Sequence, residues 1–142
     1  MNKVIRSWRN YLMEQDLRAA MVVVLDEEQN VLMLKRTEDA GWMPNKWGLP
    51  GGHIEKGESS KDAAARETKE ETNLSLNDLE QLVQRGQAMI YCSNSYTGDV
   101  EIDFEHTDWA WASYDELDNY DTTPGLKDTV RLALEKLSDN SV

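Results

Sequence analysis

The chain of 142 residues is long enough for one domain that buries about two-thirds of the surface its unfolded form exposes. Its hydrophobic content of 39% permits a core, and its net charge of −12 excludes a protein that follows a long nucleic-acid backbone, because such proteins carry a basic stripe. We therefore expect a single domain over residues 1–142. A small phosphorylated partner remains compatible with this acidity, since a divalent metal ion can supply positive charge locally.

The single cysteine, Cys92, rules out an intramolecular disulfide and is typical of a reducing compartment. No basic cluster stands near it in the sequence to activate the thiol, so we expect a buried, inert side chain. No run of residues has the apolar length of a signal peptide or a membrane span. These features predict a cytoplasmic protein with no membrane partner.

The first third of the chain predicts one short helix and two strands. Residues 4–14 carry an apolar side and suit a helix. "RAAMVVVLD" (18–26) is rich in β-branched residues and predicts a buried strand, and "VLMLKR" (31–36) predicts a second one. The turn sequence "EEQN" lies between them, so we expect a hairpin. Residues 37–48 form a loop by composition, and "LPGGHI" is a short extended piece with a tight turn.

The rest of the chain predicts a helix at 60–72, two longer strands at 79–91 and 99–112, and a closing helix. Ser59 can cap the first helix and Asp62 can close a capping box with it. The second long strand is indicated by an alternation of apolar and acidic residues in "VEIDFEH", and "SYDELDNY" predicts a short helical or turn segment. "TPGLKDTVRLALEKL" has the apolar face of an amphipathic helix. Strands interrupted by helices predict a mixed sheet packed between helices.

The helix at 60–72 carries an unusual acidic cluster. Glu67, Glu70 and Glu71 fall within an arc of about 100° of its surface. Carboxylates this close repel one another unless a cation lies among them, and Mg²⁺ favours a few carboxylates together with substrate phosphates. Arg66 stands one turn before Glu70 and can pin its carboxylate, while Glu58 precedes the helix and can orient Arg66. Glu70 and Glu71 taken alone also suit an ordinary solvated helix face.

The spacing of this whole set resembles the Nudix box. That pattern reads Gly, five residues, Glu, seven residues, Arg-Glu, a bulky aliphatic, any residue, Glu-Glu, any residue, Gly and an aliphatic. Residues 52–74, "GHIEKGESSKDAAARETKEETNL", match it with two departures. Thr68 stands where a bulky aliphatic is usual, and Asn73 replaces the glycine that ends the helix. Neither position holds a carboxylate, and asparagine also adopts the left-handed conformation of a helix cap.

The resemblance implies an α/β/α sandwich with a mixed β-sheet, and hydrolysis of a nucleoside diphosphate linked to another moiety with Mg²⁺ or Mn²⁺. Carried onto this chain, it implies that Glu70 and Glu71 bind the metal directly, with the backbone carbonyl of Gly51 as a further ligand. Glu67 completes the metal cluster or acts as a base through a bound water. Arg66 orients the carboxylates.

Further site residues are expected outside the box. The resemblance places a metal ligand or general base at Glu105, whose alternative is an outward-facing strand glutamate. Arg36, at the end of a strand, can reach a phosphate oxygen or be a surface charge. The resemblance associates a tyrosine at Tyr91 with dinucleoside polyphosphate hydrolases, although a half-buried strand tyrosine is also common. Trp42, in a loop, can touch a base or sugar.

The sequence as a whole predicts a metal-dependent pyrophosphohydrolase. Its substrate would be a small nucleotide, with a (deoxy)nucleoside triphosphate and a dinucleoside polyphosphate as the two leading classes. The alternative is a Nudix-fold nucleotide-binding or sensor module without catalysis. Such modules usually lose box carboxylates, and all four are present here.

Overall fold

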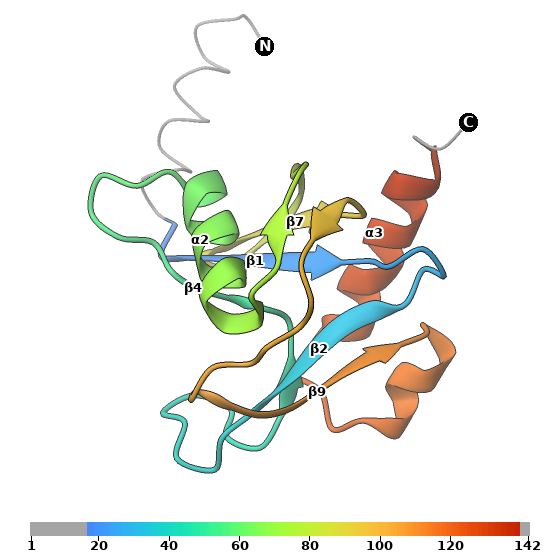
Figure 1. The fold of residues 1–142 in the computed structure, drawn as a ribbon, viewed down its shortest axis with the longest axis horizontal. Coiled ribbons are helices and arrows are strands. Elements are labelled where there is room, and N and C mark those ends of the chain that lie inside the picture. The colour runs from blue at the N-terminus through green and yellow to red at the C-terminus, as the bar shows by residue number, and fades with distance from the viewer. Residues whose placement is uncertain (1–16, 140–142) are drawn as a thin grey trace, which may run out of the picture.

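The computed structural model describes residues 17–139, so the helix expected at 4–14 lies outside the described residues. Figure 1 shows helices beside a set of crossing strands. The elements in chain order are β1 (Ala19–Val24), β2 (Val31–Arg36), β3 (Trp47–Gly48), β4 (Gly51–His53), α2 (Ser60–Thr72), β5 (Ser75–Leu76), β6 (Glu80–Arg85), β7 (Ala88–Ser93), β8 (Tyr96–Thr97), β9 (His106–Ala112), the 3-10 helix η1 (Asp115–Asn119) and α3 (Leu126–Asp139).

The strands form a mixed four-stranded sheet in the order β4-β1-β7-β6, a three-stranded sheet β3-β2-β9 and a two-stranded sheet β5-β8. In the first sheet β1 pairs parallel with β7 and antiparallel with β4. Alternate residues of β1 enter different cores: Val22 and Val24 pack in the core that contains α2, and Val23 packs in the core that contains α3. The sheet is therefore covered by a helix on each face, which confirms the predicted α/β/α fold with a mixed sheet.

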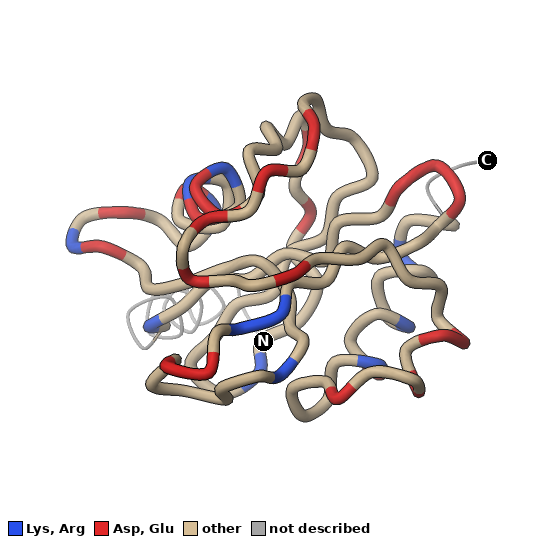
Figure 2. The backbone as a smooth tube through the Cα atoms, turned by 60° about the horizontal axis from the view of Figure 1, so that its bottom comes forward, with Lys and Arg blue, Asp and Glu red and all other residues tan. Residues whose placement is uncertain are grey.

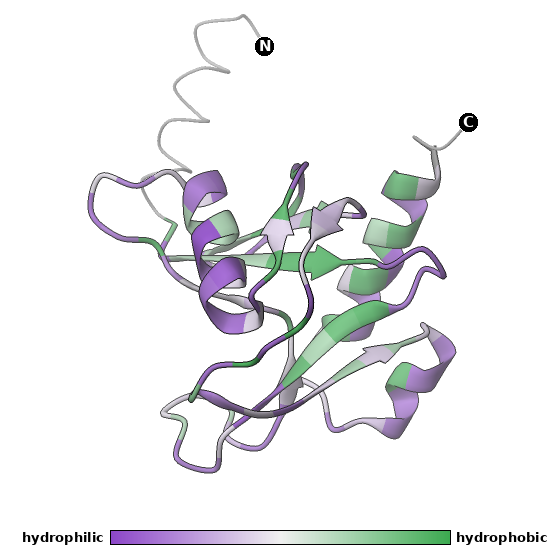
Figure 3. Cartoon of the chain, in the orientation of Figure 1, coloured by the Kyte–Doolittle hydropathy of each residue, from purple (hydrophilic) through white to green (hydrophobic). Residues whose placement is uncertain are grey.

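Both central strands are apolar on both faces. Leu32 and Leu34 of β2 lie in the α2 core, whereas Val31 and Met33 lie in the α3 core. Figure 3 shows β1 and β2 as the most hydrophobic strands of the molecule. This double burial explains why their sequences are continuous apolar runs instead of alternating ones.

The predicted hairpin of β1 and β2 is wrong. The two strands belong to different sheets and share only the bridge between Leu25 and Val31. The turn between them is nevertheless tight, because Asp26 Oδ1 accepts the N–H groups of Glu28 and Asn30 at 2.9 and 2.8 Å. Each strand instead pairs with a strand that is distant in the chain, β1 with β7 and β2 with β9.

Two other strand predictions need correction. Residues 79–91 are not one strand but most of the hairpin of β6 and β7, which turns at Gly86 with φ 59°. Residues 99–105 are not a strand either, and β9 begins only at His106. In this loop Val100 and Ile102 pack onto the α2 core, while Phe104 is 89% exposed. The alternation of apolar residues that predicted a strand comes from a loop whose Val100 and Ile102 contact the core.

The predicted helix at 60–72 is confirmed with both of its ends. Ser59 is the N-cap and its Oγ accepts the Asp62 N–H at 3.1 Å, which is one half of the predicted capping box. Asn73 ends the helix in the left-handed conformation with φ 68°, and its N–H donates to the Lys69 carbonyl. Cys92 is buried as expected, and burial raises the pKa of its thiol to about 11. Within residues 17–139 no helix has the length and apolar character needed to cross a bilayer.

Replacing Asn73 by alanine should lower the free energy of unfolding by about 1 kcal/mol, because alanine is disfavoured at a positive φ. Asn73→Gly should retain wild-type stability, since glycine adopts this conformation freely. Urea unfolding followed by circular dichroism measures both variants. Equal stabilities of the alanine and glycine variants would show that the left-handed cap does not limit the end of α2.

Candidate metal and catalytic site

The acidic helix α2 lies close to the sheet because its inner face is made of small residues. Ala63, Ala64, Thr68 and Thr72 of this face are fully buried. Thr68 fits the tight space, but its Oγ1 is buried without a hydrogen-bond partner among the described residues. Because threonine replaces the bulky aliphatic residue of the Nudix box at position 68, one polar atom beneath α2 has no hydrogen-bond partner among the described residues.

The glycine pair of β4 lets the backbone touch both the sheet and the acidic side chains. A Cβ on Gly51 would lie 2.4 Å from the Ala20 carbonyl oxygen, and a Cβ on Gly52 would lie 2.5 Å from the Glu67 carboxyl carbon. The Gly51 N–H donates to Glu71 Oε1 at 2.7 Å. Only glycine fits at position 51, because a Cβ there would clash with the backbone of β1, whereas a Cβ at position 52 would push the Glu67 carboxylate aside.

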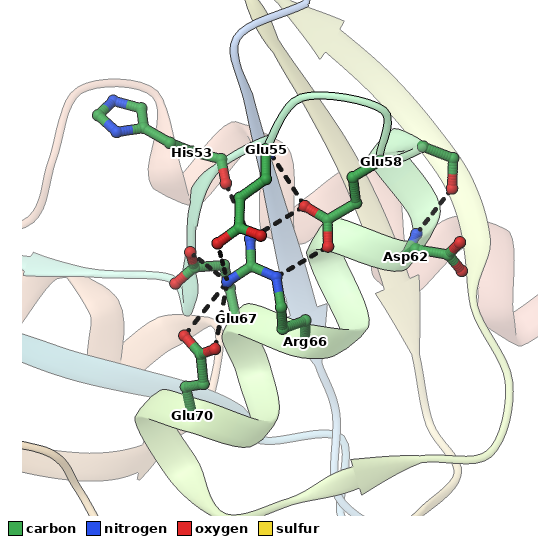
Figure 4. A network of polar contacts seen from close by, with 8 residues as sticks. His53, Glu55, Glu58, Asp62, Arg66, Glu67 and Glu70 are labelled. Atoms are coloured by element: carbon green, nitrogen blue, oxygen red, sulfur yellow. Dashed lines mark hydrogen bonds and ion pairs between the residues drawn. The ribbon is translucent and has the colours of Figure 1, made fainter.

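Arg66 gathers the outer carboxylates, as Figure 4 shows. Its Nε and Nη2 donate to the two oxygens of Glu58 at 2.8 and 3.0 Å, and Nη2 also donates to the His53 carbonyl at 3.0 Å. Its Nη1 donates to Glu67 at 3.1 Å and to Glu70 at 3.2 Å. The Arg66 hydrogen bond lowers the pKa of Glu58 to about 2, and Glu58 in turn raises the pKa of Arg66. Arg66 is thus a fixed positive centre that orients three carboxylates.

Glu71 lies on the inner side of the cluster in a different environment. It is only 3% exposed, and burial raises its pKa to about 8. The nearby charges of Glu67, Asp103 and Glu105 raise this pKa further, while the Gly51 N–H lowers it. Burial also raises the pKa of Glu67. Arg66 thus bonds to Glu58, Glu67 and Glu70 but not to Glu71, and a divalent cation fits the deficit of positive charge that remains around Glu71.

A loop before β9 brings further groups to Glu71. Ligand atoms of Glu71, Asp103 and His106 all lie within 4.8 Å of one another. Figure 2 shows acidic positions both on α2 and on the chain segment that passes it. Asp103 is not among the residues that the sequence predicts for the site. No spacing in the sequence singles it out.

The predicted residues of the box take unequal positions around this centre. Glu67 and Glu71 are turned inward, whereas the Glu70 side chain is 56% exposed and bonded to Arg66. Glu105 is exposed and lies in the turn before β9, not in a strand as expected. Its charge still acts on Glu67 and Glu71, since it raises the pKa of both.

Two predicted substrate contacts have different surroundings. Arg36 ends β2, donates its Nε–H to the Trp42 carbonyl at 2.7 Å and lies over the Trp42 ring at 5.3 Å. Tyr91 is 5% exposed, and its hydroxyl lies 2.7 Å from Ser60 Oγ in the first turn of α2. Tyr91 therefore holds the start of α2 from the interior, and its role as a substrate contact stays a prediction.

Comparisons with known proteins show a family and several relatives that this chain resembles. A family model described as the NUDIX domain matches residues 16–133. A nucleoside triphosphatase NudI of Escherichia coli O81 (strain ED1a) is 27% identical over 134 residues, which cover 81% of this chain and 95% of that protein. A candidate 8-oxo-dGTP diphosphatase of Bacillus subtilis (strain 168) is 46% identical over 55 residues, 39% of this chain and 34% of that protein. The crystal structure of a MutT protein from Methanosarcina mazei Go1 has a TM-score of 0.67 and 25% identity, covering 87% of this chain and 94% of that one.

Replacing Glu71 by glutamine should stabilise the metal-free protein at alkaline pH. The unfolded chain releases this proton near the ordinary pKa of 4.5 and the folded chain near 8, so the wild type loses stability as the pH rises between these values. Glutamine does not titrate, so its advantage is small at pH 4 and reaches at most ~5 kcal/mol above pH 8. Thermal unfolding in EDTA across this range measures the difference. An advantage independent of pH would contradict the raised pKa.

Proposed function

The chain belongs to the NUDIX domain family as a Nudix hydrolase, and on that premise we propose that it cleaves a diphosphate linkage in a (deoxy)nucleoside triphosphate with Mg²⁺ or Mn²⁺. The observation that carries this proposal is the pair of inward carboxylates, Glu67 and Glu71, held against the glycines of β4. Among the described cationic side chains only Arg66 neutralises this pair, and it bonds to Glu67 but not to Glu71. A substrate phosphate can approach so acidic a site only together with metal ions.

The triphosphate class is supported by the relatives. The NudI protein that aligns with 81% of this chain is named as a nucleoside triphosphatase, and the short Bacillus match is named for 8-oxo-dGTP. The sequence feature that favours a dinucleoside polyphosphate is Tyr91, which is buried and lies against Ser60, so this substrate class has less support. A nucleoside triphosphate is therefore the first substrate class to test.

The chain's own groups suit this chemistry. Glu67, Glu70, Glu71 and the Gly51 carbonyl would hold the metal, which when bound screens the phosphoryl oxygens and lowers the pKa of a bound water. Arg66 keeps the carboxylates of Glu67 and Glu70 from turning away. The raised pKa of Glu67 makes its carboxylate a stronger base. We therefore assign Glu67 the role of the general base that accepts a proton from the attacking water. Glu105, at the exposed edge, is the second candidate for this proton.

Exposed aromatic rings lie on the two loops beside the acidic centre. Trp42 is 52% exposed, and Phe104 stands between Asp103 and Glu105 with almost its whole ring in solvent. The loops are joined by a hydrogen bond from the Thr37 N–H to the Glu105 carbonyl at 3.2 Å. A base can stack on such rings whatever its identity. We place the base of the substrate here, with Arg36 directed to its phosphates.

A hydrolysis panel tests the proposed reaction. Nucleoside triphosphates, oxidised guanine nucleotides, dinucleoside polyphosphates, ADP-ribose and nucleotide sugars are incubated with Mg²⁺ or Mn²⁺, and products are separated by chromatography. Preferential release of a nucleotide and phosphate or pyrophosphate from triphosphates is the expected result. No turnover of any compound by metal-loaded protein would favour the nucleotide-binding module without catalysis.

Glu70→Gln should lower kcat by about 100-fold or more, because a lost metal ligand removes several kcal/mol of charge stabilisation. The matched control is Glu135→Gln on α3. Glu135 is similarly exposed, at 60%, and also pairs with an arginine at i,i+4 spacing. Steady-state kinetics of both variants give the comparison, and equal rates would remove Glu70 from the metal site.

Trp42→Ala and Phe104→Ala should each raise KM by about 5- to 100-fold with a smaller effect on kcat, since base stacking contributes ~1–3 kcal/mol per ring. Trp109→Ala is the control, because Trp109 is also exposed, at 40%, but lies on β9. The kinetics are measured with the best triphosphate of the panel. An unchanged KM in both loop variants would contradict binding of the base by these two rings.

A further inference from the structure

A short turn carries the exposed Phe104 ring beside the acidic site. Residues 103–106 form this turn, which the His106 N–H closes by donating to the Asp103 carbonyl at 3.4 Å. Phe104 and Glu105 occupy its two central positions, and Phe104 is 89% exposed. The backbone bond is long, so by itself it holds the turn only weakly. The position of the ring therefore depends on the side chains at the two ends of the turn.

The side chains of Asp103 and His106 form a second and shorter bond across the same turn. His106 Nδ1 lies 2.8 Å from Asp103 Oδ1, and since a carboxylate oxygen accepts, the ring nitrogen donates. The side chain of His106 is 3% exposed and that of Asp103 is 18% exposed. A hydrogen bond shielded from water is electrostatically stronger than an exposed one. This side-chain pair therefore holds the turn more firmly than the backbone bond does.

A β-bulge at the start of β9 turns the histidine toward α2. The register of β2 and β9 skips Thr107, because Asp108 and His106 pair with consecutive residues of β2. Side chains alternate along a regular strand, so without the extra residue His106 would face the same side as Ala112, in the α3 core. Its ring nitrogen instead lies within 4.8 Å of the Glu71 carboxylate on α2. Bulges re-aim side chains in this way, and this one brings the ring to the turn.

The backbone on both sides of the turn is anchored to other segments. The Glu101 N–H donates to the Thr72 carbonyl at 2.9 Å, at the end of α2. The Glu105 carbonyl accepts the Thr37 N–H at 3.2 Å, which ties the turn to the loop that carries Trp42. With these two points fixed, the conformation between them is set by the side-chain pair across the turn.

We propose that Asp103 and His106 are positioning residues, whose paired side chains fix the turn that presents the Phe104 ring to the base of the substrate. The inference rests on the proposed function, because that base is the group on which the ring would stack. An exposed ring on a loose turn loses conformational freedom when it stacks, and this loss weakens binding. A turn that is fixed before the substrate arrives avoids the loss. The pair therefore acts on substrate binding more than on the chemical step.

Variants of His106 in the full chain test the inference and leave every carboxylate in place. His106→Leu removes the donor and keeps a bulky side chain, whereas His106→Asn restores an N–H donor at the position of Nδ1. With the best triphosphate of the panel, His106→Leu should raise KM about fivefold or more with a smaller effect on kcat. His106→Asn should keep KM near the wild-type value. Asp26→Ala is the control, because Asp26 Oδ1 also accepts N–H groups across a turn, at the opposite end of β2.

A double variant separates this positioning role from a general structural one. In the Phe104→Ala background His106→Leu should add little to KM, because both changes act through the same ring. The inference is overturned by an equal rise of KM with and without Phe104, or by a wild-type KM in either single variant. If His106→Leu does not fold, Asp103→Ala and Asp103→Asn repeat the comparison from the acceptor side, since asparagine keeps an accepting oxygen.

Fluorine NMR observes the ring without any turnover. Phe104 is the only phenylalanine of the chain, so incorporation of fluorophenylalanine gives a single resonance. A nucleoside triphosphate with Mg²⁺ should shift this resonance in the wild type and in His106→Asn, and His106→Leu should need more nucleotide for the same shift. A wild-type resonance that nucleotide leaves unmoved would overturn the inference. Because binding is observed even without hydrolysis, the proposed reaction and the positioning role can fail separately.

Discussion

The close contact between α2 and the glycine strand β4 is the constraint on which the site depends. An acidic helix can lie this near a sheet only if its inner face is small and the facing strand has no side chains at two positions. The contact places the Gly51 N–H on Glu71 and the Gly52 backbone against the Glu67 carboxylate. The same packing that buries the helix therefore removes water from two of its carboxylates, and this raises the pKa of both.

Arg66 divides the acidic residues into two groups with opposite electrostatics. On its side Glu58 is paired bidentately and its pKa falls to about 2, so it carries a permanent charge and serves as a support. On the other side Glu71 is buried among further carboxylates and its pKa rises to about 8. The same cluster thus contains a carboxylate that is already neutralised and another that still needs a cation. This asymmetry is a physical basis for a metal site, because a uniformly paired surface helix would have no such deficit.

The sheets position acidic, imidazole and aromatic groups that α2 does not carry. β2 and β9 are far apart in the chain, yet their ladder places the turn at 103–105 beside the end of α2 and beside the loop that follows Arg36. Acidic, imidazole and aromatic groups from three segments consequently surround one region. Metal ions, phosphates and a base each need a different kind of group, and only the tertiary arrangement brings these kinds together.

The sequence alone determined the helix at 60–72 with its caps, the acidic cluster and the family, because helical neighbours at i, i+3 and i+4 are fixed by local geometry. It also predicted the layered fold, since strands interrupted by helices indicate a sheet packed between helices. It predicted the wrong pairing for β1 and β2, because each strand hydrogen-bonds to a distant segment and no local pattern records that pairing. Only the tertiary structure decided that Tyr91 is interior and that Asp103 and His106 meet Glu71. Their contacts arise from a loop anchored at two remote points, and no periodicity along the chain records such an anchor.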